Sequence, residues 1–140
     1  MRFLYLTAFI AIFTLTACKG SKSDTKKTEK VPVTASIPNV VAVFPQNSAT
    51  TVNADVKELK VTFSEEMDGG ISFVKEKDDT FPQITGKHIW DKTRKTVTLP
   101  VKLQPGKSYL IWLNSEKFKN FKSTAGKPSA PYKWTFKTVK

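Results

Sequence analysis

The sequence predicts an all-β fold, a seven-stranded antiparallel β-sandwich that follows a signal peptide and a disordered tether. Two observations support this prediction. Short runs of alternating apolar and polar residues, separated by turn-forming residues, follow one another over residues 39–138. No segment repeats its apolar residues at the spacing of an amphipathic helix. About 100 residues are enough to bury one hydrophobic core without a metal or a disulfide.

Alternation is clearest at residues 58–63, where Leu59, Val61 and Phe63 face one side and polar residues face the other. Residues 91–94 read as a hairpin turn between two strands, and residues 105–106, Pro-Gly, form another tight turn. The strand count and spacing fit a sandwich of the immunoglobulin type. The predicted strands are residues 39–44, 58–63, 71–74, 86–90, 95–101, 108–114 and 132–138.

The N-terminus has the three parts of an export signal. Arg2 supplies a positive charge, an apolar run follows, and small residues precede Cys18. The apolar run is shorter than the about 20 residues that a membrane-spanning helix needs. Cys18 is the only cysteine, so the chain cannot form an internal disulfide.

Residues 15–18, Leu-Thr-Ala-Cys, resemble the lipobox of bacterial lipoproteins. The resemblance implies removal of residues 1–17, a lipid on Cys18, and a protein that is exported and held on a bacterial membrane. We expect the outer membrane or the cell surface rather than the inner membrane. The alternative is an ordinary secretory signal that ends at a chance cysteine.

Residues 18–38 form the predicted tether, between the signal and a folded domain at residues 39–140. The tether is rich in Lys, Ser and Thr and has no periodic apolar pattern, so it buries too little surface to order itself. It is either a soluble spacer or a basic segment that lies against anionic lipid headgroups.

The chain is strongly basic, with 23 Lys and Arg against 12 Asp and Glu and a net charge of +11. Nearly all of this charge is lysine, and Arg94 is the only arginine after the signal. Proteins that read nucleic acid rely on arginine for bidentate contacts, so we expect no nucleic-acid partner. Scattered lysine on an exported protein fits a solvated surface or an anionic envelope polymer.

Four segments of the predicted domain share features with one known family: residues 43–50 (VFPQNSAT), 61–68 (VTFSEEMD), 96–109 (TVTLPVKLQPGKSY) and 134–138 (WTFKT). In this order, they resemble the bacterial Ig-like domain family of S-layer proteins (Big_5). The resemblance implies an Ig-like sandwich that acts as a structural or adhesive module without a shared active site. The loop before the last strand departs from the family, because residues 118–131 are lysine-rich.

We expect no enzyme, no cofactor, no metal site and no small-molecule substrate. His88 is the only histidine, and no serine, threonine or cysteine has a matching His and Asp partner set. One acidic cluster has a spacing that fits no calcium loop. Its members are Glu65, Glu66, Asp68, Asp78 and Asp79.

One group of residues is a candidate ligand surface. The resemblance to the family implies that Tyr109, Ile111 and Leu113 face inward, which turns Trp112 to the opposite face of its strand. An outward tryptophan can stack on a sugar or anchor a partner, unless the following loop covers it. The aromatic and lysine residues of that loop would extend the surface. The candidate residues are Trp112, Phe118, Phe121, Lys117 and Lys119.

Two functions are consistent with these features. The first is a non-catalytic, membrane-anchored Ig-like lipoprotein that serves as a structural or interaction module of the cell envelope, with an envelope protein as its partner. The second is a lipoprotein that binds an anionic glycan or peptidoglycan through exposed aromatics and lysines. A third role, as an accessory subunit of a larger complex, stays open.

Overall fold

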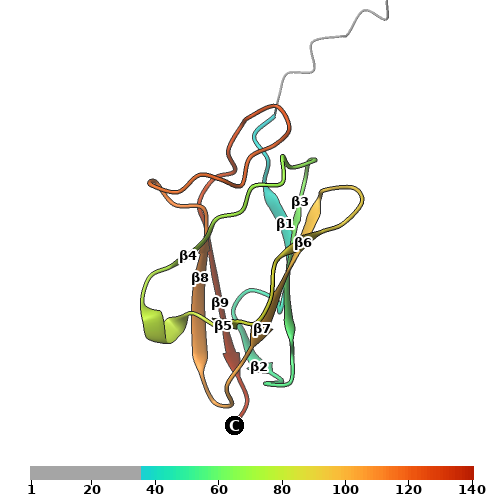
Figure 1. Cartoon of the computed structure of the whole chain (residues 1–140). Helices are drawn as coiled ribbons and strands as arrows, with labels where there is room; N and C mark the ends of the chain where they lie inside the picture. The colour runs from blue at the N-terminus through green and yellow to red at the C-terminus, as the bar shows by residue number, and fades with distance from the viewer. Residues whose placement is uncertain (1–35) are drawn as a thin grey trace, which may run out of the picture. The chain divides into compact units, whose positions relative to one another are not determined.

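The computed structural model describes residues 36–140 (Figure 1). The predicted signal peptide, Cys18 and the predicted tether up to residue 35 lie outside the described residues. Pro38 is fully buried, so the fold already includes the residue before the expected start of the domain. The elements are β1 (Val40–Phe44), β2 (Ala49–Val52), β3 (Glu58–Phe63), β4 (Phe73–Lys75), the short 3-10 helix η1 (Asp78–Thr80), β5 (Gln83–Ile84), β6 (Ile89–Trp90), β7 (Thr96–Lys102), β8 (Ser108–Leu113) and β9 (Tyr132–Thr138).

The strands form two sheets that pack face to face, and the predicted all-β sandwich is confirmed (Figure 1). The first sheet has the order β1-β3-β7-β5, with β6 also paired to β7. The second has the order β2-β9-β8-β4. This two-sheet arrangement is consistent with an immunoglobulin-type sandwich. The described residues contain nine strands rather than the predicted seven, since β2 and β5 were not foreseen.

The chain crosses from one sheet to the other between β1 and β2. Hydrogen bonds to β9 hold this crossing in place: the indole N–H of Trp134 donates to the carbonyl of Pro45 (2.9 Å), and the N–H of Ser48 donates to the carbonyl of Thr135. The side chain of Asn47 accepts the N–H of Thr135 (2.8 Å). The crossing turns β2 parallel to β9, so the expectation of a purely antiparallel sandwich is wrong at this pair.

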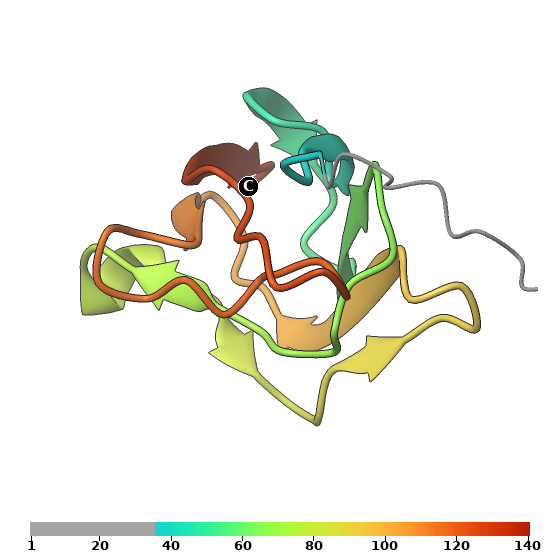
Figure 2. The same cartoon turned by 90° about the horizontal axis from the view of Figure 1, so that it is seen from above.

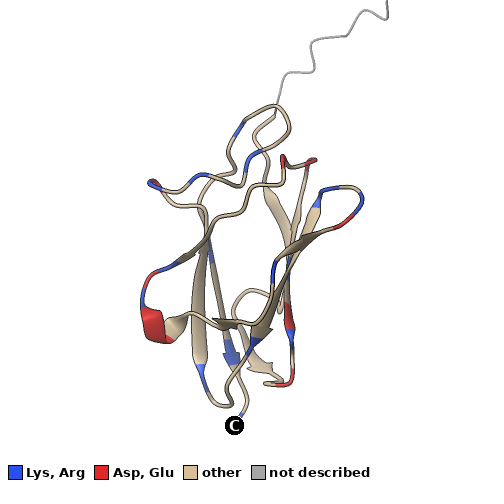
Figure 3. Cartoon of the chain, in the orientation of Figure 1, with Lys and Arg blue, Asp and Glu red and all other residues tan. Residues whose placement is uncertain are grey.

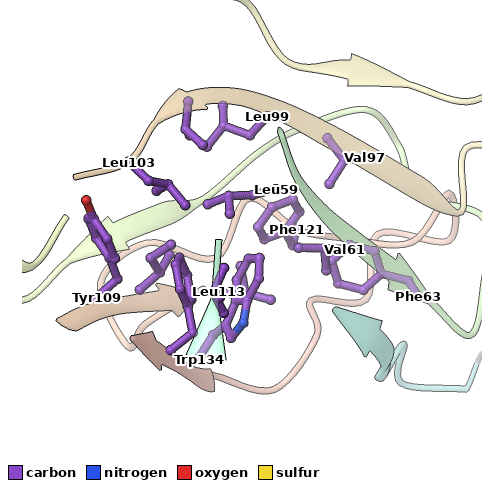
Figure 4. Close-up of a cluster of buried hydrophobic side chains, with 14 of the residues drawn as sticks. Leu59, Val61, Phe63, Val97, Leu99, Leu103, Tyr109, Leu113, Phe121 and Trp134 are labelled. Atoms are coloured by element: carbon purple, nitrogen blue, oxygen red, sulfur yellow. The ribbon is translucent and has the colours of Figure 1, made fainter. Parts of the chain in front are cut away.

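The core lies between the two sheets and is built by alternation along four long strands (Figure 4). Leu59 and Val61 of β3 pair with Leu99 and Val97 of β7, and all four side chains are buried. Across the core, β8 and β9 contribute buried residues in the same way, including Tyr109, Ile111, Trp134 and Phe136. Burying an apolar side chain of this size stabilises the fold by about 1.5–3 kcal/mol. The residues that were predicted to face inward on these four strands make up most of the core.

The described chain begins at one end of the sandwich and terminates at the other (Figure 1). The first end also carries residues 64–70, the β6–β7 hairpin and the long segment 114–131. Hydrogen bonds connect these loops: the N–H of Ser64 donates to the carbonyl of Asn39, and the N–H of Asp68 donates to that of Lys122. Among residues 36–140, no helix has the length and apolar character needed to cross a membrane.

Candidate functional site

Trp112 lies on the outer face of the β4-β8-β9 sheet, as the alternation along β8 predicts. Its side chain is half-buried, and its partners across the sheet are Val74 of β4 and Lys133 of β9. The indole N–H donates to a carboxylate oxygen of Glu76 (2.9 Å), and the Lys133 ammonium lies 5.8 Å from the centre of the ring. One ring face is therefore already occupied by a cation, which leaves less of it for a stacking ligand.

Phe121 does not belong to the candidate ligand surface, and that part of the prediction is wrong. Its side chain is fully buried and packs on three other rings, with centroids 5.1 Å from Phe63, 5.2 Å from Phe73 and 6.2 Å from Trp90. Figure 4 shows the Phe121 ring among the core side chains. The reason is that segment 114–131 folds back over the end of the sandwich and places this phenylalanine between the sheets.

Asn114 fixes the position of Phe121. The buried amide of Asn114 accepts the N–H of Phe121 (3.0 Å) and donates to the carbonyls of Phe121 (3.0 Å) and Ser129 (2.9 Å). Asn114 has a φ of 60°, a left-handed backbone conformation that asparagine tolerates better than most residues. These bonds satisfy buried polar groups and tie both ends of the lysine-rich segment together.

Phe118 is the exposed aromatic of this segment, with 55% of its surface accessible to solvent. A tight turn produces this exposure. The hydroxyl of Ser115 accepts the N–H of Phe118 (3.1 Å), while the Phe118 carbonyl accepts the N–H of Ser115 and the hydroxyl of Ser72. The flanking Lys117 and Lys119 are also exposed, so these three predicted residues share one stretch of surface.

A hollow of about 490 Å³, here called the β4 groove, lies beside Phe118. Five consecutive residues around β4 form one wall, and side chains from the opposite sheet form the other. β4 and β5 belong to different sheets, and Figure 2 shows them as separate strands in successive shades from green to yellow. Val74 connects the groove to Trp112, because the two residues are paired across β4 and β8. The lining residues are Ile71, Ser72, Phe73, Val74, Lys75, Ile84, Leu99, Phe118 and Asn120.

The groove follows a free strand edge. Within residues 36–140, β4 pairs only with β8. The N–H of Asn114 donates to the carbonyl of Ser72 (3.0 Å), which places Ser72 in the hydrogen-bonded position of the ladder. Because these positions alternate in an antiparallel pair, Phe73 and Lys75 direct their backbone N–H and carbonyl groups away from β8. The groove therefore offers both unpaired backbone groups and apolar walls, along a strand that was predicted at residues 71–74.

The chain matches the family model described as bacterial Ig-like domain over residues 22–138. It belongs to the bacterial Ig-like domain family. The resemblance seen in the four sequence segments is thus confirmed, and the match begins inside the segment predicted as a tether.

The solved structures to which the chain is similar include two of S-layer proteins. The first is the S-layer protein rSbsC(31-844), with 21% identity and a TM-score of 0.49 over 76% of this chain. The second is the N-terminal part of the bacterial S-layer protein SbsC, with 22% identity and a TM-score of 0.49 over 76% of this chain. This chain spans 14% of the first structure and 24% of the second. A search of the curated proteins found no match.

In this bacterial Ig-like domain, the acidic stretch within residues 61–68 has a structural role. Met67 is fully buried, its N–H donates to the carbonyl of Arg94, and the carbonyl of Glu66 accepts the N–H of Thr124. The carboxylate of Asp68 accepts the N–H of Gly70 (2.8 Å). Backbone bonds thus join this stretch to the β6–β7 hairpin and to segment 114–131. Over residues 36–140, no group of three or more His, Cys, Asp or Glu side chains is arranged to hold a metal ion.

The third and fourth family segments, residues 96–109 and 134–138, are hydrogen-bonded to each other. The hydroxyl of Tyr109 accepts the N–H of Gln104 (2.7 Å), which closes the turn between β7 and β8. Gly106 occupies the left-handed position of this turn, with a φ of 66°, where glycine is favoured. Thr138 at the end of β9 donates its hydroxyl to the carbonyl of Gln104 and accepts the N–H of Lys107 (2.9 Å). The turn is therefore anchored to the last strand.

Proposed function

We propose that this chain is a lipid-anchored protein of the bacterial envelope whose Ig-like domain binds a partner protein through the β4 groove, without catalysis. The observation that carries the proposal is the groove itself, an apolar hollow along a free strand edge with an exposed phenylalanine at its rim. Grooves of this kind accept an extended segment that adds a strand to the sheet.

Backbone geometry supports this mode of binding. An added strand would pair with the free N–H and carbonyl groups of Phe73 and Lys75 on the edge of β4. Its alternate side chains would face Ile84 and Leu99 on the opposite wall. Main-chain hydrogen bonds give such complexes affinity, and the side-chain pockets give them specificity. The partner segment is therefore expected to alternate apolar residues with polar ones.

Charge around the groove supports an acidic partner. Lys75 lines the groove, and the exposed Lys117 and Lys119 flank Phe118 at the rim. Glu116 is the only acidic side chain of segment 114–131, which also contains Lys122 and Lys127. Complementary charge speeds association and selects against basic partners, and the effect weakens as salt rises.

Phe118→Ser tests the groove. The matched control is Ile89→Ser, because Ile89 is exposed to a similar degree, 63% against 55%, and does not line the groove. In capture experiments from solubilised envelope membranes, we expect Phe118→Ser to lose the partner retained by the wild type and by Ile89→Ser. Removing a large apolar anchor from an interface costs about 2 kcal/mol or more. Equal capture by both variants would exclude the groove.

The lipid anchor is proposed from Cys18 and the residues before it. Intact mass spectrometry of the protein from its native membrane should give a chain that begins at Cys18 and carries acyl chains. Two or more acyl chains make membrane attachment stable, while one chain is marginal. An unmodified Cys18 in the mature protein would contradict the anchor and would leave the groove proposal standing.

The second candidate function, glycan binding at Trp112, has weaker support. The half-buried ring on an outer sheet face favours it, while the Lys133 ammonium 5.8 Å from the ring centre competes with a stacked sugar. Trp112→Ala distinguishes the two functions: it would remove binding to envelope polysaccharides in the second case and leave capture of the protein partner intact in the first.

A further inference from the structure

A second hollow, here called the lysine pocket, lies near the opposite end of the sandwich, where the chain terminates. It has a volume of about 360 Å³, within the range of about 300–1,000 Å³ that small-molecule sites occupy. Side chains from β4, η1, the start of β5 and the β7–β8 turn surround it. The lining residues are Lys75, Asp78, Phe81, Pro82, Gln83, Lys102, Gln104, Lys107 and Tyr109.

The charge of the lysine pocket is positive. Three lysines line it against a single carboxylate, Asp78, which is already paired with Lys75. This leaves the ammonium groups of Lys102 and Lys107 free of an acidic partner among the described residues. Figure 3 shows basic residues gathered near this end of the sandwich, around the turn that follows β7 and the end of β9. Lysines converging on a hollow concentrate anions there.

Two of the lining residues are held in place before any ligand arrives. The Lys107 ammonium donates to the side-chain carbonyl of Gln104 (3.3 Å) and lies 5.6 Å from the centre of the Tyr109 ring. Tyr109 is almost fully buried, and its hydroxyl accepts the N–H of Gln104. The turn is also bonded to Thr138 of β9. Such preorganisation lowers the entropic cost of binding.

Uncharged groups complete the lysine pocket. The amides of Gln83 and Gln104 can each donate and accept hydrogen bonds, as a hydroxyl-rich ligand requires. Pro82 is buried and Phe81 is half-buried, and together they supply an apolar wall. The lining thus combines cations, amides and an apolar surface, which matches one face of a sugar ring that bears an acidic group.

We infer that the lysine pocket binds a single sugar residue that carries a carboxylate or a phosphate. Lys102 and Lys107 pair with the anionic group, and Gln83 and Gln104 bond to ring hydroxyls. The inference goes beyond the proposed function, because the lysine pocket and the β4 groove share only Lys75. Both carboxylated and phosphorylated sugars provide the same chemistry, an anionic oxygen group on a polyhydroxylated ring.

Titration calorimetry on the purified full chain at low salt, with glucuronate, glucose 1-phosphate and glucose as probes, tests the inference. We expect at least one anionic sugar to bind and glucose to bind at least about tenfold more weakly, since a charged hydrogen bond is worth about 1.5 kcal/mol or more. Binding of glucuronate alone indicates a carboxylated ligand, and binding of glucose 1-phosphate alone a phosphorylated one. Equal binding of glucose, or no binding of either anion, would overturn the inference.

Variants locate the site. Lys102→Ala and Lys107→Ala should each weaken binding of the anionic sugar about tenfold, and Lys107→Arg should retain most of it. The control is Lys92→Ala, because Lys92 is exposed in the β6–β7 turn and does not line the pocket. Thermal melting of each variant confirms that it is folded. If Lys92→Ala weakens binding as much as Lys107→Ala, the attraction is due to net charge and the pocket is not the site.

Discussion

Asn114 decides which of two phenylalanines is exposed. Phe118 and Phe121 are both followed by lysine, and their sequence context is alike. The buried amide of Asn114 holds the backbone of Phe121 on both its N–H and its carbonyl, which directs that side chain into the core. The contacts join residues seven positions apart outside any regular element, so no periodic pattern reveals them. Sequence reasoning found Phe118 correctly and misplaced Phe121 for this reason.

Asn114→Ala should lower the free energy of unfolding by about 3 kcal/mol, because it leaves the buried N–H of Phe121 without its acceptor. The left-handed backbone conformation at a φ of 60° is also less favourable for alanine than for asparagine. Urea unfolding measures the change. The control is Asn120→Ala in the same segment, where an exposed side chain is lost and a change within about 0.5 kcal/mol is expected. Similar losses for the two variants would show that Asn114 is not the anchor of the segment.

Alternation predicted the long strands, and adjacent turn residues predicted the short strands β4 and β6, whereas β2 and β5 had neither signal. The long strands β3, β7, β8 and β9 each bury three or more alternating residues, which gives a clear period of two. β2 buries only Val52 fully, and β5 has two residues, both exposed. Such short strands are positioned by pairing with their neighbours, which sequence does not display. The parallel β2–β9 pair was missed for the same reason.

The β6–β7 hairpin was predicted from residues 91–94, and its pairing is confirmed. Asp91 holds the turn: its carboxylate accepts the hydroxyl of Thr93 (2.8 Å) and the backbone N–H groups of Lys95 (3.1 Å) and Thr96 (3.2 Å). The bond from Thr93, followed by the backbone bonds, lowers the pKa of Asp91 below its ordinary value of 3.8. The charged form of Asp91 is therefore the form that stabilises the hairpin.

The lowered pKa of Asp91 predicts a pH-dependent contribution to stability. The contribution is fully present above the ordinary value of 3.8 and is lost as the pH falls through the lowered pKa. Asp91→Asn should therefore be less stable than the wild type at neutral pH, with the difference shrinking on acidification below that value. Urea unfolding at several pH values measures it. Thr93→Val, which removes the largest cause of the shift, should weaken the pH dependence, and a difference that is constant with pH would contradict this account.

At the scale of the whole molecule, the candidate site depends on elements that sequence could not bring together. Lys117, Phe118 and Lys119 were correctly expected at the surface. The groove beside them lies between β4 of one sheet and β5 of the other. β4 was predicted as a strand and β5 was not, and sequence did not show that the two strands lie at sheet edges beside each other. Trp112 was placed on the correct face of β8, but its contacts with Glu76 and Lys133 come from segments far away in the sequence. The fold class could be predicted from the local alternation of apolar and polar residues. The groove could be recognised only in the tertiary structure, because its walls come from two different sheets.

Site-specific photo-crosslinking in the native envelope tests the central claim most directly. A photoreactive side chain at Ile84 faces the β4 groove, while one at Ile89, exposed on the neighbouring strand, lies outside it. We predict a protein adduct at position 84 that is absent at position 89 and disappears when Phe118→Ser is added. The same adducts at both positions, or no adduct at position 84, would contradict partner binding at the β4 groove.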